Sequence, residues 1–129
     1  MIGFTNQLQT PTDLLDKLKY DLGRMQDDPS NIYASFDFFV TAEHLPDWIG
    51  DKTIKKEYEI LKVVSHLANG AKHFMVSSQR HNILERNTYW CDSNEQEVKY
   101  TDGEGGSQSH SALELAEKVY KFWENILIR

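Results

Sequence analysis

The segment from Asn31 to Leu45 constrains the fold most, because as a helix it would be apolar around most of its circumference. A helix that is hydrophobic on nearly all sides needs other elements around it, so this segment is predicted to form a central helix. Pro46 lacks an amide hydrogen and clashes with the preceding turn, so the helix is predicted to stop or kink near Leu45. The apolar residues of the central helix are Ile32, Tyr33, Phe36, Phe38, Phe39, Val40, Ala42 and Leu45.

Three amphipathic helices are predicted to surround the central one. The first begins at the TPTD motif, where Thr10 can cap the helix and Pro11 fits its first position. The next is expected over residues 51–76, with one apolar face and a polar face opposite. The last opens at Ser111, which Glu114 follows after three residues in the arrangement of a capping box.

Two β-prone runs before the last helix are predicted to pair with each other. NTYWC and EVKYT are separated by DSNEQ, which indicates a hairpin over residues 87–101, and its aromatic residues are expected to pack against the helices. GEGGSQS at 103–109 is predicted to be a flexible connection. With 129 residues and no internal linker, the chain is expected to be a single domain, 1–129. The predicted fold is mainly all-α, a four-helix bundle with a short β-hairpin inserted before the last helix.

Composition restricts the class of partner. The formal net charge of −6, from 14 basic and 20 acidic residues, argues against a broad phosphate-binding surface, so bare nucleic acid is not expected as a partner. The sequence shows neither a signal-peptide pattern nor a long uninterrupted apolar stretch, so we expect a cytoplasmic protein without a membrane span. Cys91 is the only cysteine, which excludes an internal disulfide and a cysteine-based zinc cluster.

Two rows of polar side chains interrupt these helices. They consist of Asp37, Thr41 and His44 on the central helix and of His66, Asn69 and His73 on the helix over 51–76. If the rows face each other, they form a polar seam inside the bundle that could bind a ligand or transfer a proton. In the catalytic interpretation the carboxylate of Asp37 orients the imidazole of His66. The alternative is a buried hydrogen-bonded pair that satisfies itself.

The spacing along the helices argues against a metal site. If the two helices are antiparallel, Asp37 lies level with about residue 64, close to His66. His44 is then about 13 Å from His66 along the axis, and His73 about 10 Å, whereas bonds from zinc to its ligands are about 2 Å. No metal ligand is therefore predicted, and the sequence assigns no cofactor.

Cationic or potentially cationic residues gather at one end of the 51–76 helix. Lys72, His73, Arg80 and His81 can complement the negative end of the helix. They can also form a small anion pocket, in which Arg80 would supply a forked donor. Both interpretations stay open on the sequence alone.

Three resemblances accompany these patterns. Histidines on two neighbouring helices resemble the DinB-type metal-binding bundles, although the i, i+4 histidine pair of that class is missing here. The predicted bundle resembles the HEPN ribonucleases in overall shape only. Arg80 is followed at once by His81, whereas the motif of that class spaces its arginine and histidine more widely. FDFFVTAEHLPDW at 36–48, NGAKHF at 69–74, RH at 80–81 and FWENIL at 122–127 are similar to a small family of bacterial and phage helical proteins to which no activity is attached.

The functional expectation is a small cytoplasmic binding or regulatory module. It would recognise a protein or small ligand through the polar face of the central and 51–76 helices, with Asp37 and His66 as catalytic candidates. The ligand-binding candidates are His44, Asn69, Lys72, His73, Arg80 and His81. The alternative is a hydrolase or HEPN-like nuclease that uses Asp37 and His66 beside a cationic anion stabiliser. A homodimer is a further expectation, based on apolar positions near the C-terminus such as Ile128.

Overall fold

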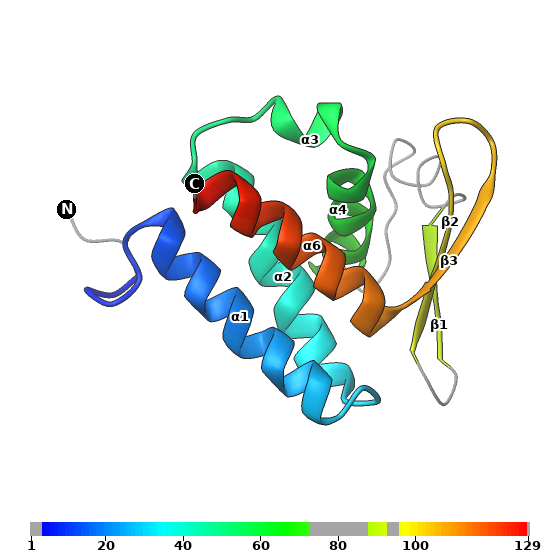
Figure 1. The fold of residues 1–129 in the computed structure, drawn as a ribbon, viewed down its shortest axis with the longest axis horizontal. Helices are drawn as coiled ribbons and strands as arrows, with labels where there is room; N and C mark the ends of the chain where they lie inside the picture. Colours follow the sequence, from blue (N-terminus) through cyan, green and yellow to red (C-terminus); the bar gives the residue numbers. More distant parts are fainter. Residues whose placement is uncertain (1–3, 73–87, 93–95, 129) are drawn as a thin grey trace.

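The computed structural model describes residues 4–72, 88–92 and 96–128, which are mostly helical and carry a small antiparallel sheet (Figure 1). The mainly helical character is therefore as predicted. The helices are α1 (Pro11–Asp27), α2 (Ile32–Trp48), α3 (Ile54–Glu57), α4 (Glu59–Lys72) and α6 (Ala112–Leu127). The strands are β1 (Thr88–Cys91), β2 (Glu97–Thr101) and β3 (Ser107–Ser111). None of the described helices is long and apolar enough to cross a lipid bilayer.

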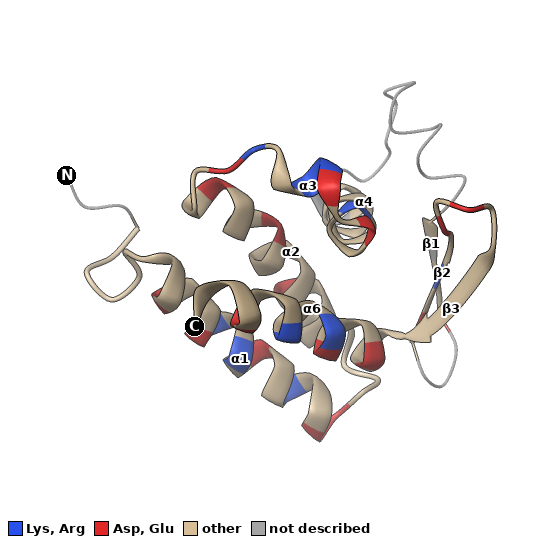
Figure 2. Cartoon of the chain, turned by 45° about the horizontal axis from the view of Figure 1, so that its top comes forward, with Lys and Arg blue, Asp and Glu red and all other residues tan. Residues whose placement is uncertain are grey.

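Helix α2 contacts α1, α4 and α6, as expected of a central helix (Figures 1 and 2). One hydrophobic core joins these helices to the sheet: Phe38 of α2 and Trp123 of α6 are fully buried, and so is Val98 of β2. The start of α2 departs from the prediction, since Tyr33 is 77% exposed and Phe36 50% exposed. The four-helix bundle and the single-domain organisation stay predictions.

The predicted starts of the first and last helices are confirmed. The hydroxyl of Thr10 accepts a hydrogen bond from the amide of Asp13, whose carboxylate accepts one from the amide of Thr10. Ser111 and Glu114 form the same reciprocal pair at the start of α6. Both capping boxes satisfy amide groups that the first helical turn leaves without partners.

The central helix does not stop at Leu45, one of the two predicted outcomes, because α2 continues through Pro46 to Trp48. Proline removes one hydrogen bond within a helix, and here that loss falls in the last turn, where few further bonds depend on it. The ring of Pro46 is fully buried, so the residue also fills space in the core.

The predicted helix over 51–76 is divided. A short helix, α3, ends at Glu57, Tyr58 is extended with φ −122° and ψ 122°, and α4 begins at Glu59. The ring of Tyr58 packs edge-on against Phe122 of α6, with centroids 4.8 Å apart. This long-range contact holds the chain at the break, and helical periodicity could not reveal it. Residues 73–76 of the predicted helix lie outside the described part of the chain.

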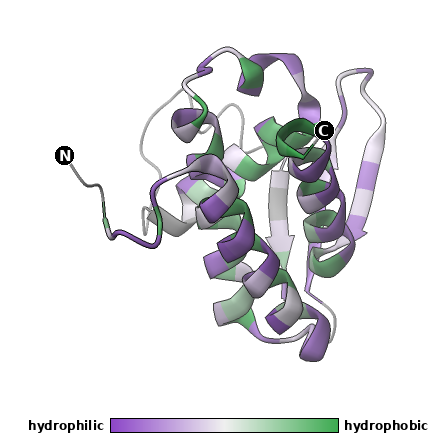
Figure 3. Cartoon of the chain, turned by 60° about the vertical axis from the view of Figure 1, so that its left-hand side comes forward, coloured by the Kyte–Doolittle hydropathy of each residue, from purple (hydrophilic) through white to green (hydrophobic). Residues whose placement is uncertain are grey.

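The sheet has three strands, so the predicted two-stranded hairpin and the flexible connection after it are both wrong. Antiparallel β1 and β2 do pair as expected, but Ser107–Ser111 adds β3 on the other side of β2. Strand β3 has the sequence SQSHS, and Figure 3 draws it white to purple, so no apolar pattern could reveal the third strand.

Asp102 locks the turn between β2 and β3. Its carboxylate accepts hydrogen bonds from the amides of Glu104 at 2.9 Å and Gly106 at 2.7 Å, and from the side-chain amide of Gln108 at 2.9 Å. Gly105 has a φ of +84°, and a side chain at position 106 would come within 2.8 Å of the carboxylate. The glycine-rich segment is therefore a tight turn.

Acid should loosen this turn. The side-chain amide of Gln108, followed by the amides of Gly106 and Glu104, lowers the pKa of Asp102 from its ordinary value. A group whose folded-state pKa is lowered stabilises the fold above its unfolded pKa, and this contribution is lost as the pH falls through the folded value. Below the ordinary aspartate range we expect faster amide hydrogen exchange at Gly106, measured by NMR. The variant Asp102→Asn should show fast exchange already at neutral pH. An unchanged rate in that variant would contradict the role of the Asp102 carboxylate in stabilising the turn.

Candidate functional site

A cluster of charged side chains joins α1 to α2. Asp21 is fully buried, and its carboxylate forms ion pairs with Lys17 and, at 3.3 Å, with Arg24. Arg24 also pairs with Asp37 of α2 at 2.6 Å, while the hydroxyl of Thr41 lies 3.5 Å from Asp21. We call these five residues the α1–α2 ion cluster. Its two acidic and two basic groups balance, as a buried carboxylate requires.

The α1–α2 ion cluster contains two members of the polar row predicted on the central helix. Asp37 and Thr41 therefore have their partners on α1, and the hydrogen bond to Asp37 is the main reason why the pKa of Arg24 is raised. His44, the third member of that row, is exposed. The side of α2 that meets α4 carries Glu43 instead, whose carboxylate accepts hydrogen bonds from Lys55 and from Ser65 at 2.9 Å.

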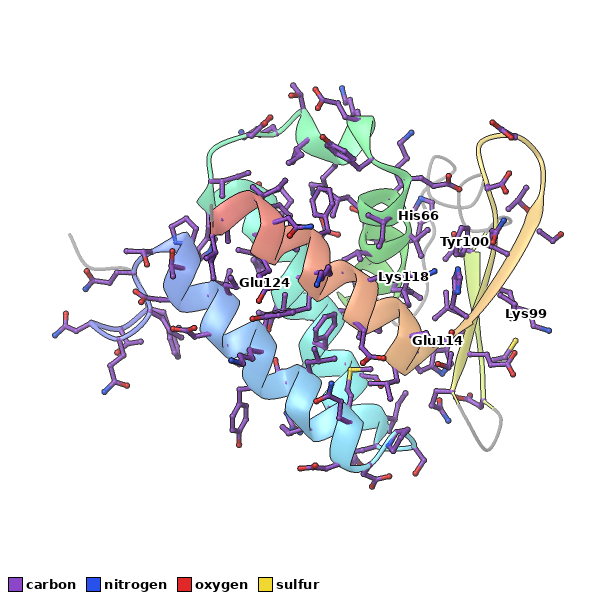
Figure 4. The ribbon with its side chains drawn as sticks, in the orientation of Figure 1. His66, Lys99, Tyr100, Glu114, Lys118 and Glu124 are labelled. Carbon is purple, nitrogen blue, oxygen red and sulfur yellow. The ribbon has the colours of Figure 1, made fainter. Side chains whose placement is uncertain are left out.

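The polar row predicted on the 51–76 helix lies on α4 and faces the sheet. Nδ1 of His66 and Oγ1 of Thr88, on β1, are 3.1 Å apart and share a hydrogen bond. Thr88 stands opposite Tyr100 in the strand register, so both side chains lie on the sheet face that meets α4. Figure 4 shows His66 and Tyr100 in the space between α4 and the sheet.

Asn69 completes this junction from α4. At about 100° per residue its side chain lies between Ser65, which bonds to α2, and His66, which bonds to β1. The Nδ2 atom of Asn69 is buried and has no hydrogen-bond partner among the residues that the structure describes.

The electrostatic surroundings keep the phenol of Tyr100 protonated. Partial burial is the largest cause of its raised pKa, and the negative charges of Glu59 and Asp102 add to it. The ring of His110, on β3, lies 5.8 Å from the ring of Tyr100. Tyr100 is therefore a hydrogen-bond donor at neutral pH rather than a base.

We call His66, Asn69, Thr88, Tyr100 and His110 the α4–sheet site. It offers donors from Asn69 and Tyr100, and an imidazole that shares a hydrogen bond with Thr88. The residues that the structure describes contain no group of three or more His, Cys, Asp or Glu side chains arranged to hold a metal ion. The chemistry available is hydrogen bonding to acceptor atoms, with His66 able to accept or donate a proton.

The predicted site residues fall into three groups. His66 and Asn69 belong to the α4–sheet site, and Asp37 belongs to the α1–α2 ion cluster; the catalytic roles of Asp37 and His66 stay predictions. Lys72 is the last residue of α4. The ligand-binding candidates outside the described residues are His73, Arg80 and His81.

Sequence reasoning missed Asp21, Thr88 and His110. Asp21 had a signal, because it interrupts the leucine stripe of α1 with Lys17 four residues before it and Arg24 three residues after it. Thr88 and His110 had no such signal, since both depend on strand pairing.

Comparison with known proteins adds no relative: no protein-family model, curated protein or solved structure matches the chain.

Proposed function

We propose that the protein is a binding or regulatory module that recognises a protein segment or small ligand at the α4–sheet site. The observation that carries this proposal is the buried, unpartnered Nδ2 atom of Asn69. A buried donor without a partner costs free energy, and such groups are rare in folded proteins. A ligand acceptor atom would remove that cost in the bound state, which gives the site a reason to retain asparagine.

The donors favour a ligand that carries carbonyl oxygens. Asn69 and the protonated Tyr100 can each donate to such an oxygen. Glu59 and Asp102 act on Tyr100 as negative charges, which disfavours a bare phosphate group in the same place. We therefore propose an amide-bearing ligand, such as a peptide segment or a small carboxamide.

Recognition explains the geometry better than turnover does. Asp37, the carboxylate that a hydrolase or HEPN-like nuclease would need beside His66, is engaged by Arg24 on α1. Cytoplasmic location and the four-helix bundle remain parts of the proposal, as expected from the sequence.

The variant Asn69→Leu separates recognition from packing. Removing a buried donor without a partner should raise the free energy of unfolding by about 1 kcal/mol in the unliganded protein, measured by urea denaturation. The same variant should lose binding of N-acetylglycinamide, followed by NMR shifts at residues 66, 69 and 100. Inorganic phosphate serves as the comparison probe and should leave these signals in place.

Ser35→Ala is the matched control. Ser35 is also buried with a hydroxyl that has no partner, but it lies on α2 near its start. Its replacement should preserve the response to N-acetylglycinamide. If the wild-type protein shows no shifts with this probe, or if Asn69→Leu responds as the wild type does, recognition of amides at Asn69 is wrong.

A further inference from the structure

Strand β3 forms one margin of the sheet, and it lies at the edge of the described molecule in all three ribbon views (Figures 1, 2 and 3). β3 has the sequence SQSHS and five consecutive pairs with β2, without a bulge. It has no lysine, proline or acidic residue, which are common devices that prevent an edge strand from pairing with another chain.

The backbone groups that face this margin can be identified from the ladder. The amide of Asp102 donates to the carbonyl of Gly106 at 2.8 Å, and the amide of Ala112 donates to the carbonyl of Gln96 at 2.7 Å. In an antiparallel pair, hydrogen-bonded and non-hydrogen-bonded residue pairs alternate. Both bonds give the same alternation along the register, so Gln108 is among the residues that bond to β2.

The residues between these bonded positions therefore point their backbone groups away from β2. They are Ser107, Ser109 and Ser111. The amide of Ser111 is already used, because it donates to the carboxylate of Glu114 at 3.1 Å. Ser107 and Ser109 are left with one amide and one carbonyl each at the margin. Both residues are exposed.

We infer that β3 pairs antiparallel with β3 of a second copy of this chain, centred on Gln108. In this register Ser107 of each copy stands opposite Ser109 of the other, so the free amides and carbonyls of both residues bond to each other. Gln108 of the two copies then meets across the twofold axis. The pairing leaves none of the identified free groups unused and brings no like charges together.

The self-complementarity of this margin favours a second copy over an unrelated peptide. Peptides that add a strand to a sheet are selected by pockets for their alternate side chains. The β3 margin instead presents small serine side chains around one glutamine, which is a symmetric arrangement. The inference is independent of the ligand proposed for the α4–sheet site.

Ser109→Pro tests the pairing directly. Because the amide of Ser109 faces the margin, proline removes no backbone bond to β2, only the 3.5 Å contact from the Ser109 hydroxyl to Glu97. Edge strands tolerate proline at such positions. Analytical ultracentrifugation from micromolar to millimolar concentration should show a wild-type dimer. The dimer of the variant should be weaker by about tenfold or more. Hydrogen exchange of the wild-type protein should show Ser107 and Ser109 amides whose protection rises with concentration. The amides of Gln108 and His110 should be protected at every concentration.

Ser109→Lys keeps the amide and covers the case in which the proline variant does not fold. Its two added ammonium groups lie in the same small interface and should weaken the dimer, more so at low salt. Thr101→Lys is the matched control, because Thr101 is exposed on β2 but does not face the margin. A monomer at all concentrations overturns the inference. A dimer that leaves the exchange of Ser107 and Ser109 unchanged, or that persists in both Ser109 variants, also overturns it.

Discussion

Replacing Trp123 by alanine should lower the free energy of unfolding by about 3–5 kcal/mol, the range measured when a large buried aromatic side chain is truncated. Trp123 is fully buried in the core, against Phe122 on its own helix, with ring centroids 5.3 Å apart. The surrounding side chains of α1 and α2 would have to close a large cavity. Urea denaturation followed by circular dichroism measures the change.

Trp123→Phe distinguishes volume from hydrogen bonding at the same position. The Nε1 atom of Trp123 is buried and has no partner, so phenylalanine removes an unsatisfied donor while it fills most of the space. We expect a loss of about 1 kcal/mol. Tyr20→Ala is the control, because Tyr20 is 68% exposed on α1 and should change stability little. Equal losses for Trp123→Ala and Trp123→Phe would show that the indole nitrogen is satisfied in solution.

Replacing Asp21 by alanine should lower the free energy of unfolding by about 3 kcal/mol. The fully buried carboxylate holds Lys17 and Arg24 on one side of α1 and receives Thr41 from α2. Without it, Lys17 loses its ion-pair partner, Arg24 keeps only Asp37, and Thr41 loses its acceptor. Thermal and urea denaturation at neutral pH give the change.

Two variants define what Asp21 contributes. Asp21→Asn keeps the shape of the side chain and removes its charge, so most of the loss should persist if ion pairing is the cause. Asp16→Ala makes the same truncation as Asp21→Ala at an exposed position of α1 and should have an effect within about 0.5 kcal/mol of zero. A loss at Asp16 as large as the loss at Asp21 would contradict the role of burial.

The α1–α2 ion cluster also explains why the described residues show no contact between Asp37 and His66, the predicted catalytic pair. The polar row of α2 was identified from helical periodicity, which shows that Asp37 and Thr41 share a face but not which neighbour that face meets. In the structure that face meets α1, where Arg24 pairs with Asp37 and Asp21 accepts a hydrogen bond from Thr41. The row of α4 was found in the same way, and its partner, Thr88, comes from a strand that is far away in the sequence.

The sequence alone determined the features that short-range interactions produce. Thr10, Pro11, Ser111 and Glu114 specify helix starts through contacts within four residues, and the apolar circumference of α2 required a central position. The tertiary structure decided the third strand, the break at Tyr58 and the surroundings of His66 and Asn69. These depend on which distant segments meet, and a polar strand such as SQSHS gains its pairing energy only when β2 is already beside it.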